Sequence, residues 1–435
     1  MSKYEERWAR TEAFRHDRFG MFIHWGLYAI PARGEWVRSH ERISVEDYEQ
    51  FFEEFDPYKY DPKAWARLAR EAGMKYAVMT TKHHDGFCLF DSAYTDYKAT
   101  NTKAGRDLIR EYVEAFRAEG LKVGFYYSLL DWHHPDYPHY GDRQHPMRDN
   151  PAYKNDGRNF DNYLTYMHNQ VRELLTNYGK IDIMWFDFSY QDEYNDMRGE
   201  TWRATDLVNM AHALQPGIIL DNRLGGDGAE QTSGDDEPVY AGDFKSPEQT
   251  VPAEGLLDDM GRDVAWEACM TLNDHWGYCS ADKNYKSAKT VIRMLTECVS
   301  KGGNLLLNVG PNAKGEIPRE SVEILRQVGR WMDDNGESIY GCGKADVPKP
   351  EWGRYTKKGD TYYAHVYDTS TSVLRFDVGR EVEKVRLVSD ASELVKMRPW
   401  NAEHNKKGLV HDVFVDLQNV TLPDEIDTVI KLKVK

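Results

Sequence analysis

The chain has 435 residues, of which 40% are hydrophobic, so it is long enough for one large domain with a companion domain and a sizeable core. Its 56 basic and 72 acidic residues give a formal net charge of −16, which argues against binding to nucleic acid or to an anionic membrane. Aromatic residues make up 13% of the chain, and Trp and Tyr rings suit partly apolar ligands such as sugars.

The N-terminal stretch, residues 1–20, is charged throughout and contains no apolar region typical of a signal peptide. No run of 18 apolar residues occurs, so we expect no transmembrane helix. The five cysteines form no CxxC pair, and we interpret them as buried thiols of a reducing compartment: Cys88, Cys269, Cys279, Cys298 and Cys342. We therefore expect a cytoplasmic protein.

Up to about residue 340, short apolar runs alternate with amphipathic stretches. The apolar runs lie at 19–26, 76–84, 121–130, 181–188, 217–223 and 303–310. Helical patterns cover 61–73, which starts at an Asp-Pro pair and ends at a glycine, and 106–120. This order predicts a parallel sheet covered on both faces, and its spacing favours a (β/α)₈-like (TIM) barrel over residues 1–343. A doubly wound sheet is the alternative, but no GxGxxG or Walker pattern follows these runs.

Beyond about residue 345 the apolar segments become short, alternating and rich in β-branched residues. They lie at 361–368, 373–379, 384–389, 409–417 and 428–435, with turn residues between them. Residues 344–352 contain two prolines and are interpreted as a linker. We predict a C-terminal antiparallel β-sandwich domain over residues 344–435.

Polar or aromatic residues end the apolar runs at positions where a purely structural strand would remain apolar. They are His24, Trp25, His83, His84, Asp85, Tyr126, Tyr127, Ser128, Asp187, Asn222 and Arg223. Active sites of such barrels lie at the C-terminal ends of the strands, so these residues are candidates for one site. Asp187 is the most informative, because it shares a strand face with Ile183 and Trp185 and would be costly to bury without a partner or a function.

Metal and serine-hydrolase chemistry have little support in the sequence. His83 and His84 are neighbours on a strand and point to opposite faces, and the other doublet, His133 and His134, lies in a different loop. No HExxH or GxSxG motif is present. We therefore expect no metal and no organic cofactor, with a metal-dependent hydrolase as a disfavoured alternative.

Three glutamates have a context typical of an active site. Glu35 lies in RGEWV, Glu248 in a loop flanked by Gly, Ser and Pro, and Glu267 beside Trp266 at an expected strand. For each of these three glutamates, the sequence alone does not distinguish a functional acid from an ordinary surface carboxylate.

Five blocks resemble the signature blocks of α-L-fucosidases, glycoside hydrolase family 29, and occur in that family's order. They are RFGMFIHWGLYAIPARGEW (18–36), KHHDGFCLFDS (82–92), GFYYSLLDWHHPDY (124–137), IMWFDF (183–188) and GGNLLLNVGPNAKGEIP (302–318). The resemblance implies an exo-acting enzyme that hydrolyses terminal α-L-fucosyl linkages of oligosaccharides with retention, through a covalent fucosyl-enzyme.

The resemblance also implies residue roles. Asp187 matches the family's nucleophile, in agreement with the choice made from the strand pattern. The family's sugar-binding residues match His24, Glu35, Trp36, His83, His84, Tyr126, Trp185 and Arg223. For the acid/base, whose position varies in the family, Glu248 is the first candidate and Glu267 the second.

Two alternatives remain open at this point. The chain could be a non-catalytic fucose-binding relative, or a related glycosidase that acts on another L-sugar. The expected partner is a fucosylated oligosaccharide, and a homo-oligomer is compatible with the sequence.

Overall fold

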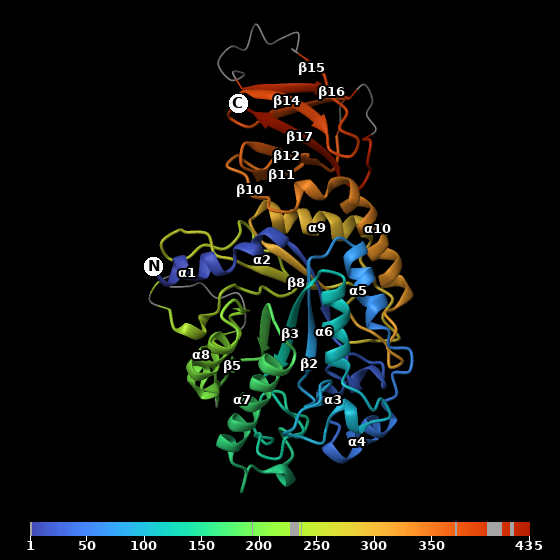
Figure 1. Cartoon of the computed structure of the whole chain (residues 1–435), viewed down its shortest axis with the longest axis vertical. Helices are drawn as coiled ribbons and strands as arrows, with labels where there is room; N and C mark the ends of the chain where they lie inside the picture. The colour runs from blue at the N-terminus through green and yellow to red at the C-terminus, as the bar shows by residue number, and fades with distance from the viewer. Residues whose placement is uncertain are drawn as a thin grey trace.

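The computed structural model describes residues 2–193, 195–226, 235, 237–369, 372–397, 411–417 and 422–435. Figure 1 shows a large α/β body that carries the N-terminus and a smaller β domain that carries the C-terminus. Helix α9 (Ala288–Ser300) lies between the central strands and the β domain, and α10 (Arg319–Asn335) packs against α9 and runs along the side of the larger body beside α5 (Pro62–Glu71).

A seven-stranded parallel sheet forms the centre of the larger body. Its order is β7-β4-β3-β2-β1-β9-β8. The strands are β1 (Phe19–Ile23), β2 (Tyr76–Lys82), β3 (Lys122–Ser128), β4 (Ile183–Asp187), β7 (Ile219–Leu220), β8 (Glu267–Thr271) and β9 (Asn304–Val309). Nearly every residue of these strands is buried, as expected for a parallel sheet covered on both faces. The predicted barrel-like parallel sheet is confirmed.

An irregular segment bridges the gap between the two edge strands of this sheet. Phe244 pairs in parallel with Asp221 just after β7, and Lys245 pairs in parallel with Trp266 just before β8. Farther along, Glu248 pairs with Cys269 within β8. Pro247 interrupts a regular ladder because it has no N–H to donate. The barrel is thus closed by an irregular eighth segment, and Glu248 lies at its end, held to β8, where the sequence had suggested a loop.

Helices follow the strands and cover the barrel (Figure 1). They are α1 (Lys3–Arg10), α2 (Glu12–Asp17), α3 (Val37–His40), α4 (Val45–Glu54), α5 (Pro62–Glu71), α6 (Leu108–Ala118), α7 (Phe160–Asn177) and α8 (Ala204–Leu214), followed by α9 and α10. The two helices predicted from sequence, α5 and α6, are confirmed. The Asp61 carboxylate caps α5 by accepting a hydrogen bond from the amide of Ala64, and Gly73 follows it with a φ of 84°. Within the described ranges, no helix has the length and apolar composition needed to cross a bilayer.

The C-terminal domain consists of antiparallel sheets, as predicted. One has the order β10-β11-β12-β17-β14 and another the order β13-β16-β15. The strands are β10 (Gly343–Lys344), β11 (Gly353–Lys358), β12 (Thr361–Val366), β13 (Val373–Asp377), β14 (Val382–Leu387), β15 (Lys396–Met397), β16 (Asp412–Asp416) and β17 (Thr428–Val434). Strand β11 was not predicted, and residues 409–410 of one predicted strand lie outside the described residues.

Side-chain hydrogen bonds join the β domain to the barrel's helices. Trp331 of α10 donates its indole N–H to the carbonyl oxygen of Asp427 at 3.0 Å, and Arg293 of α9 donates to that of Ile426 at 2.9 Å. Asp427 itself is buried and contacts His365 Nδ1 at 2.8 Å.

The larger body also contains a two-stranded antiparallel sheet. Its strands, β5 (Tyr190–Gln191) and β6 (Asp196–Met197), follow the end of β4.

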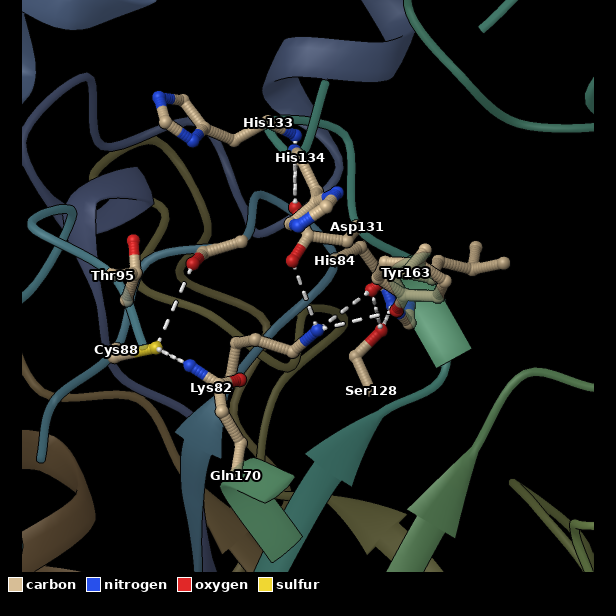
Figure 2. A network of polar contacts seen from close by, with 12 residues as sticks. Lys82, His84, Cys88, Thr95, Ser128, Asp131, His133, His134, Tyr163 and Gln170 are labelled. Carbon is tan, nitrogen blue, oxygen red and sulfur yellow. Dashed lines mark hydrogen bonds and ion pairs between the residues drawn. The ribbon is translucent and has the colours of Figure 1, made fainter. Parts of the chain in front are cut away.

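A fully buried ion pair joins the last residue of β2 to the loop that follows β3 (Figure 2). The Lys82 ammonium lies 3.1 Å from Asp131, and the two side chains are 0% and 2% exposed. The second carboxylate oxygen of Asp131 accepts hydrogen bonds from the amides of His133 and His134. The Lys82 charge helps to lower the pKa of Asp131 against the opposing effect of burial, so the carboxylate remains ionised.

We predict that Lys82→Met destabilises the protein by about 3–5 kcal/mol, because it leaves the charge of Asp131 buried without its partner. Urea unfolding followed by circular dichroism measures the loss. The double variant Lys82→Met/Asp131→Leu should recover part of it, but not all, because two amides then lose their acceptor. A single variant within about 1 kcal/mol of wild type would contradict this role for the pair.

Candidate active site

A cavity of about 250 Å³ opens at the C-terminal ends of the barrel strands. Its volume lies below the range typical of drug-sized ligands and suits one small ring. It is lined by Phe22, His24, Glu35, Trp36, His83, His84, Tyr126, Arg143, Trp185, Asp187, Phe188, Ser189, Tyr190, Arg223, Gly226, Glu248, Cys269 and Trp276. All eight predicted sugar-binding residues and the two first-choice carboxylates are therefore brought together.

Asp187 is the last residue of β4, and its side chain is 14% exposed to the cavity. Its Oδ2 accepts a hydrogen bond from the Tyr126 hydroxyl at 2.7 Å, and its Oδ1 accepts one from Arg223 at 3.0 Å. Phe188 follows with a φ of 78°, a left-handed conformation that costs energy for an aromatic residue and turns the chain sharply after the strand. The carboxylate is thus held between two donors on a rigid strand end.

Arg223 joins the two first-choice carboxylates. Its Nη1 lies 3.0 Å from Asp187 Oδ1 and 2.8 Å from Glu248 Oε2, so these two oxygens are at most 5.8 Å apart. Burial works against the guanidinium charge, but Asp187 and Glu248 raise the pKa of Arg223 above its ordinary value. The cation therefore stays charged at any pH at which the protein is folded.

The remaining donors of Arg223 fix its orientation. Its Nε donates to the hydroxyl of Ser246 at 3.1 Å, and its Nη2 donates to the carbonyl oxygen of the same residue at 3.0 Å. Its guanidinium carbon lies 4.7 Å from the centre of the Trp185 ring, a cation–π contact. Ser246 belongs to the irregular eighth segment, so this segment positions both Arg223 and Glu248.

The two carboxylates differ in exposure. The Glu248 side chain is 41% exposed, against 14% for Asp187, and it lies at the mouth of the cavity. Glu248 can therefore contact both solvent and the part of a ligand that projects out of the cavity, whereas Asp187 can contact only the part that enters it.

Three histidines of the cavity are held neutral by burial. Desolvation lowers the pKa of His24 and of His84 to about 3, and it lowers that of His83 well below the ordinary value. His83 Nδ1 is buried and has no hydrogen-bond partner among the described residues. Neutral imidazoles can both donate and accept hydrogen bonds, so they suit hydroxyl groups better than anions.

Glu35 contributes a buried carboxyl to the same wall. Its Oε2 accepts a hydrogen bond from the amide of Gly277 at 2.7 Å, and the residue is 5% exposed. Burial raises the pKa of Glu35, while this hydrogen bond opposes the shift. A carboxyl so placed can bind a ligand hydroxyl at a fixed position.

Aromatic rings form the rest of the cavity. The Trp185 ring lies 5.2 Å from Phe22 and 6.1 Å from Tyr126, centre to centre. The Trp36 ring packs against Phe188, with ring centres 5.5 Å apart. Such walls bind the apolar faces and methyl groups of small ligands.

Glu267, the second candidate for the acid/base, does not line the cavity. It begins β8, is 0% exposed, and accepts hydrogen bonds from Tyr76 at 2.7 Å and from Trp185 at 2.9 Å. The structure thus places it beneath the cavity floor, where it holds the Trp185 ring that forms part of the wall.

Several lining residues were not identified from the sequence. They are Phe22, Arg143, Phe188, Ser189, Tyr190, Gly226, Cys269 and Trp276. The ring of Trp276 lies 5.1 Å from that of His24. Arg143 comes from the long loop after β3, whose charge pattern gave no sign that it reaches the cavity. Among the described residues, no group of three His, Cys, Asp or Glu side chains is arranged to hold a metal ion.

A family model described as Alpha-L-fucosidase matches residues 2–337. The chain belongs to the α-L-fucosidase family, glycoside hydrolase family 29. It is therefore a glycoside hydrolase, and its barrel and β-sandwich are those of this family's solved structures. The resemblance seen in the five sequence blocks is confirmed.

The similarity to known proteins covers nearly the whole chain. Alpha-L-fucosidase isoenzyme 1 from Paenibacillus thiaminolyticus is 60% identical, with a TM-score of 0.93 and 99% of each chain covered. Tissue alpha-L-fucosidase of Bos taurus is 30% identical over 96% of this chain and 87% of its own length. A family 29 alpha-L-fucosidase of Bacteroides thetaiotaomicron, solved as a trapped covalent intermediate with 2-fluoro-fucosyl fluoride, is 31% identical with a TM-score of 0.83, and 98% of this chain and 96% of that one are covered.

The burial of Glu267 predicts that the free energy of unfolding depends on pH. Burial raises its pKa from 4.5 to about 7, so between these values the folded protein holds a proton that the unfolded chain releases. This contribution to stability is greatest below pH 4.5 and is lost as the pH rises to about 7. Relative to Glu267→Gln, which cannot titrate, wild type should lose about 3 kcal/mol over this interval. Urea unfolding at several pH values measures the difference, and parallel curves for the two proteins would contradict it.

Proposed function

We propose that this protein is an exo-acting, retaining α-L-fucosidase that hydrolyses terminal α-L-fucosyl linkages of oligosaccharides and glycoconjugates. The observation that carries the proposal is the spacing of Asp187 and Glu248, whose nearest oxygens to Arg223 are at most 5.8 Å apart. Retaining enzymes need their two carboxyl groups about 5–5.5 Å apart, whereas inverting enzymes need about 6.5–9.5 Å to admit a water.

In the proposed first step, Asp187 attacks the anomeric carbon and Glu248 gives a proton to the departing glycosidic oxygen. The C–O bond to the leaving group breaks as the bond to the Asp187 carboxylate forms, which leaves a covalent β-fucosyl-enzyme. In the second step, Glu248 takes a proton from water, and the water oxygen displaces Asp187 to release α-L-fucose. Each carboxyl group returns to its starting state.

The exposure of the two candidate acids favours Glu248 over Glu267. An acid/base must reach the leaving group and then bulk water, and Glu248 is 41% exposed at the cavity mouth. Glu267 is 0% exposed, and both of its oxygens already accept hydrogen bonds. We assign Glu267 a structural part, in support of Trp185.

Arg223 and Tyr126 suit the charge changes of this reaction. Both donate hydrogen bonds to Asp187 in the resting site and keep the nucleophile aimed along β4. As the carboxylate gives up its charge to form the ester, Arg223 keeps its contact with Glu248, which becomes an anion after it has donated its proton. One cation thus compensates whichever carboxylate is ionised.

The cavity wall suits a 6-deoxy sugar. His24, His83, His84 and Glu35 can bind ring hydroxyls, while rings such as Trp185 and Phe22 can hold the C5 methyl group. The small cavity volume, about 250 Å³, favours one terminal sugar residue and hence exo action. The covalent intermediate trapped in the Bacteroides thetaiotaomicron enzyme supports the same two-step route.

Replacing Asp187→Ala should lower kcat on an aryl α-L-fucoside by roughly 10⁴-fold or more, because the covalent step loses its nucleophile. Azide added to this variant should restore turnover and give a β-fucosyl azide, since azide enters the face that the carboxylate occupied. Product analysis by NMR distinguishes the two anomers. Normal turnover without azide would overturn the assignment, and fucose binding by calorimetry with no hydrolysis by wild type would instead indicate a non-catalytic sugar-binding protein.

Replacing Glu248→Ala should lower kcat/KM for natural fucosides by about 10²–10⁴-fold, with a smaller loss for aryl fucosides whose leaving groups need little protonation. Azide should here give an α-fucosyl azide, because it attacks the β-linked intermediate. Glu254→Ala, an exposed glutamate farther along the same segment, serves as the matched control and should remain within about twofold of wild type. If Glu267→Ala shows the leaving-group pattern and Glu248→Ala does not, the two roles are reversed.

A further inference from the structure

Two histidines of the cavity, His24 and His84, share one hydrogen-bonding arrangement. Each presents its Nδ1 to a side-chain oxygen outside the cavity, at 2.7 Å from Asn308 Oδ1 and at 2.6 Å from Ser128 Oγ respectively. Which atom donates in each contact follows from what else the partner side chain binds.

For His84 the direction is set by the carbonyl of Leu130. The Ser128 hydroxyl lies 2.9 Å from this carbonyl oxygen, which can only accept, so Ser128 donates its single hydrogen there. The same hydroxyl has no second hydrogen for His84. Its oxygen must therefore accept from His84, whose Nδ1 carries the proton.

For His24 the direction is set by the carbonyl of Trp276. The side-chain amide of Asn308 donates through Nδ2 to this oxygen at 2.7 Å, so its Oδ1 is the atom that faces His24. An amide oxygen only accepts, and His24 must also carry its proton on Nδ1.

Both rings are neutral at working pH, since burial lowers each pKa to about 3. A neutral imidazole with a proton on Nδ1 has an unprotonated Nε2, which can only accept. Among the described residues, no side chain or amide makes a hydrogen bond to Nε2 of either ring.

We propose that Ser128 and Asn308 are positioning residues that hold His84 and His24 as Nδ1–H tautomers, so that both present Nε2 as an acceptor for hydroxyl hydrogens of the bound sugar. The histidines are part of the sugar site, whereas Ser128 and Asn308 lie behind them and act through them. The part of this inference that concerns the sugar rests on the proposed function, and the tautomers themselves do not.

The tautomer of His84 also affects Asp187. His84 Nε2 lies 4.0 Å from Asp187 Oδ2, which already accepts a hydrogen bond from Tyr126. A proton on Nε2 would point toward this carboxylate, where the negative charge would attract it and draw the ring out of place. Ser128 holds the proton on the opposite side of the ring, so Nε2 stays available to the sugar and the carboxylate keeps its lone pairs for attack.

The buried Lys82–Asp131 pair fixes the carbonyl on which the His84 assignment depends. Figure 2 shows Lys82 between Asp131 on one side and the group around Ser128 and His84 on the other. The ammonium lies 3.5 Å from the carbonyl oxygen of Leu130 and 3.1 Å from Asp131. The backbone amide of Trp132 donates to the carbonyl oxygen of His84 at 2.8 Å and joins the two loops again. The acceptor for Ser128 is thus held by contacts that do not involve the sugar.

The tautomers can be measured directly by ¹⁵N NMR of histidine side chains in the free protein. Signals of His84 and His24 are assigned from their absence in His84→Gln and His24→Gln. We expect a protonated Nδ1 and an unprotonated Nε2 for both rings across pH 5–8. A proton on Nε2 of His84 or of His24 overturns the inference for that ring.

Ser128→Ala tests the positioning role in function. Without its acceptor, the His84 signal should shift toward the Nε2–H form, and kcat/KM on an aryl α-L-fucoside should fall about tenfold, the worth of one buried hydrogen bond. Ser128→Thr keeps the hydroxyl and should restore the wild-type tautomer and most of the activity. Cys88→Ala is the matched control, because it also removes one Cβ substituent from a fully buried residue near Lys82 without touching His84.

The two arms separate this inference from the proposed function. Suppose that wild type hydrolyses no fucoside, that His84 carries its proton on Nδ1, and that this proton moves to Nε2 in Ser128→Ala. The fucosidase proposal then fails and the positioning role stands. If Ser128→Ala keeps the wild-type tautomer, or loses no more activity than Cys88→Ala, the positioning role of Ser128 is wrong whatever the substrate. Thermal unfolding of each variant confirms that a folded protein is compared.

Discussion

The active site depends on one buried cation shared by two carboxylates. Arg223 contacts Asp187 at 3.0 Å and Glu248 at 2.8 Å, and its other donors are bound to Ser246. Two carboxylates this close together repel each other in a partly desolvated cavity whenever both are ionised, and the cation between them offsets this repulsion. In the proposed two-step displacement, this cation contacts the nucleophile Asp187 at a strand end and the acid/base Glu248 at the cavity mouth.

The barrel supplies the rigidity that this arrangement requires. Asp187 ends a strand that is hydrogen-bonded on both sides, and Glu248 ends the irregular segment that closes the barrel between β7 and β8. The buried Lys82–Asp131 pair joins the end of β2 to the loop after β3, and the neutral His83 and His84, which follow Lys82, line the cavity. The cavity lining thus combines the charged Arg223 and its two carboxylate partners with neutral histidines and aromatic rings.

Much of this was accessible from sequence patterns. Near-continuous apolar runs separated by capped helices predicted the parallel sheet, and the Asp61-Pro62 cap and Gly73 marked the ends of α5 correctly. Polar residues at run ends, Asp187 above all, marked the cavity. The prediction was incomplete where chain geometry is irregular, as in the segment around Pro247 and in the loop that brings Arg143 to the cavity, because neither carries a periodic pattern.

The sequence by itself determined the fold class, the family and the strand-end residues of the site, because burial on both faces of a parallel sheet imposes a pattern that single residues interrupt visibly. Only the tertiary structure distinguishes Glu248 from Glu267 and favours Glu248 in the proposed mechanism. Both follow plausible contexts in the chain, but one is exposed beside Arg223 and the other is buried beneath Trp185. The exposure of these two glutamates depends on residues brought together from distant parts of the chain. The hydrogen bond from Ser128 to the carbonyl oxygen of Leu130 depends on how a loop turns. Neither feature produces a local pattern in the sequence.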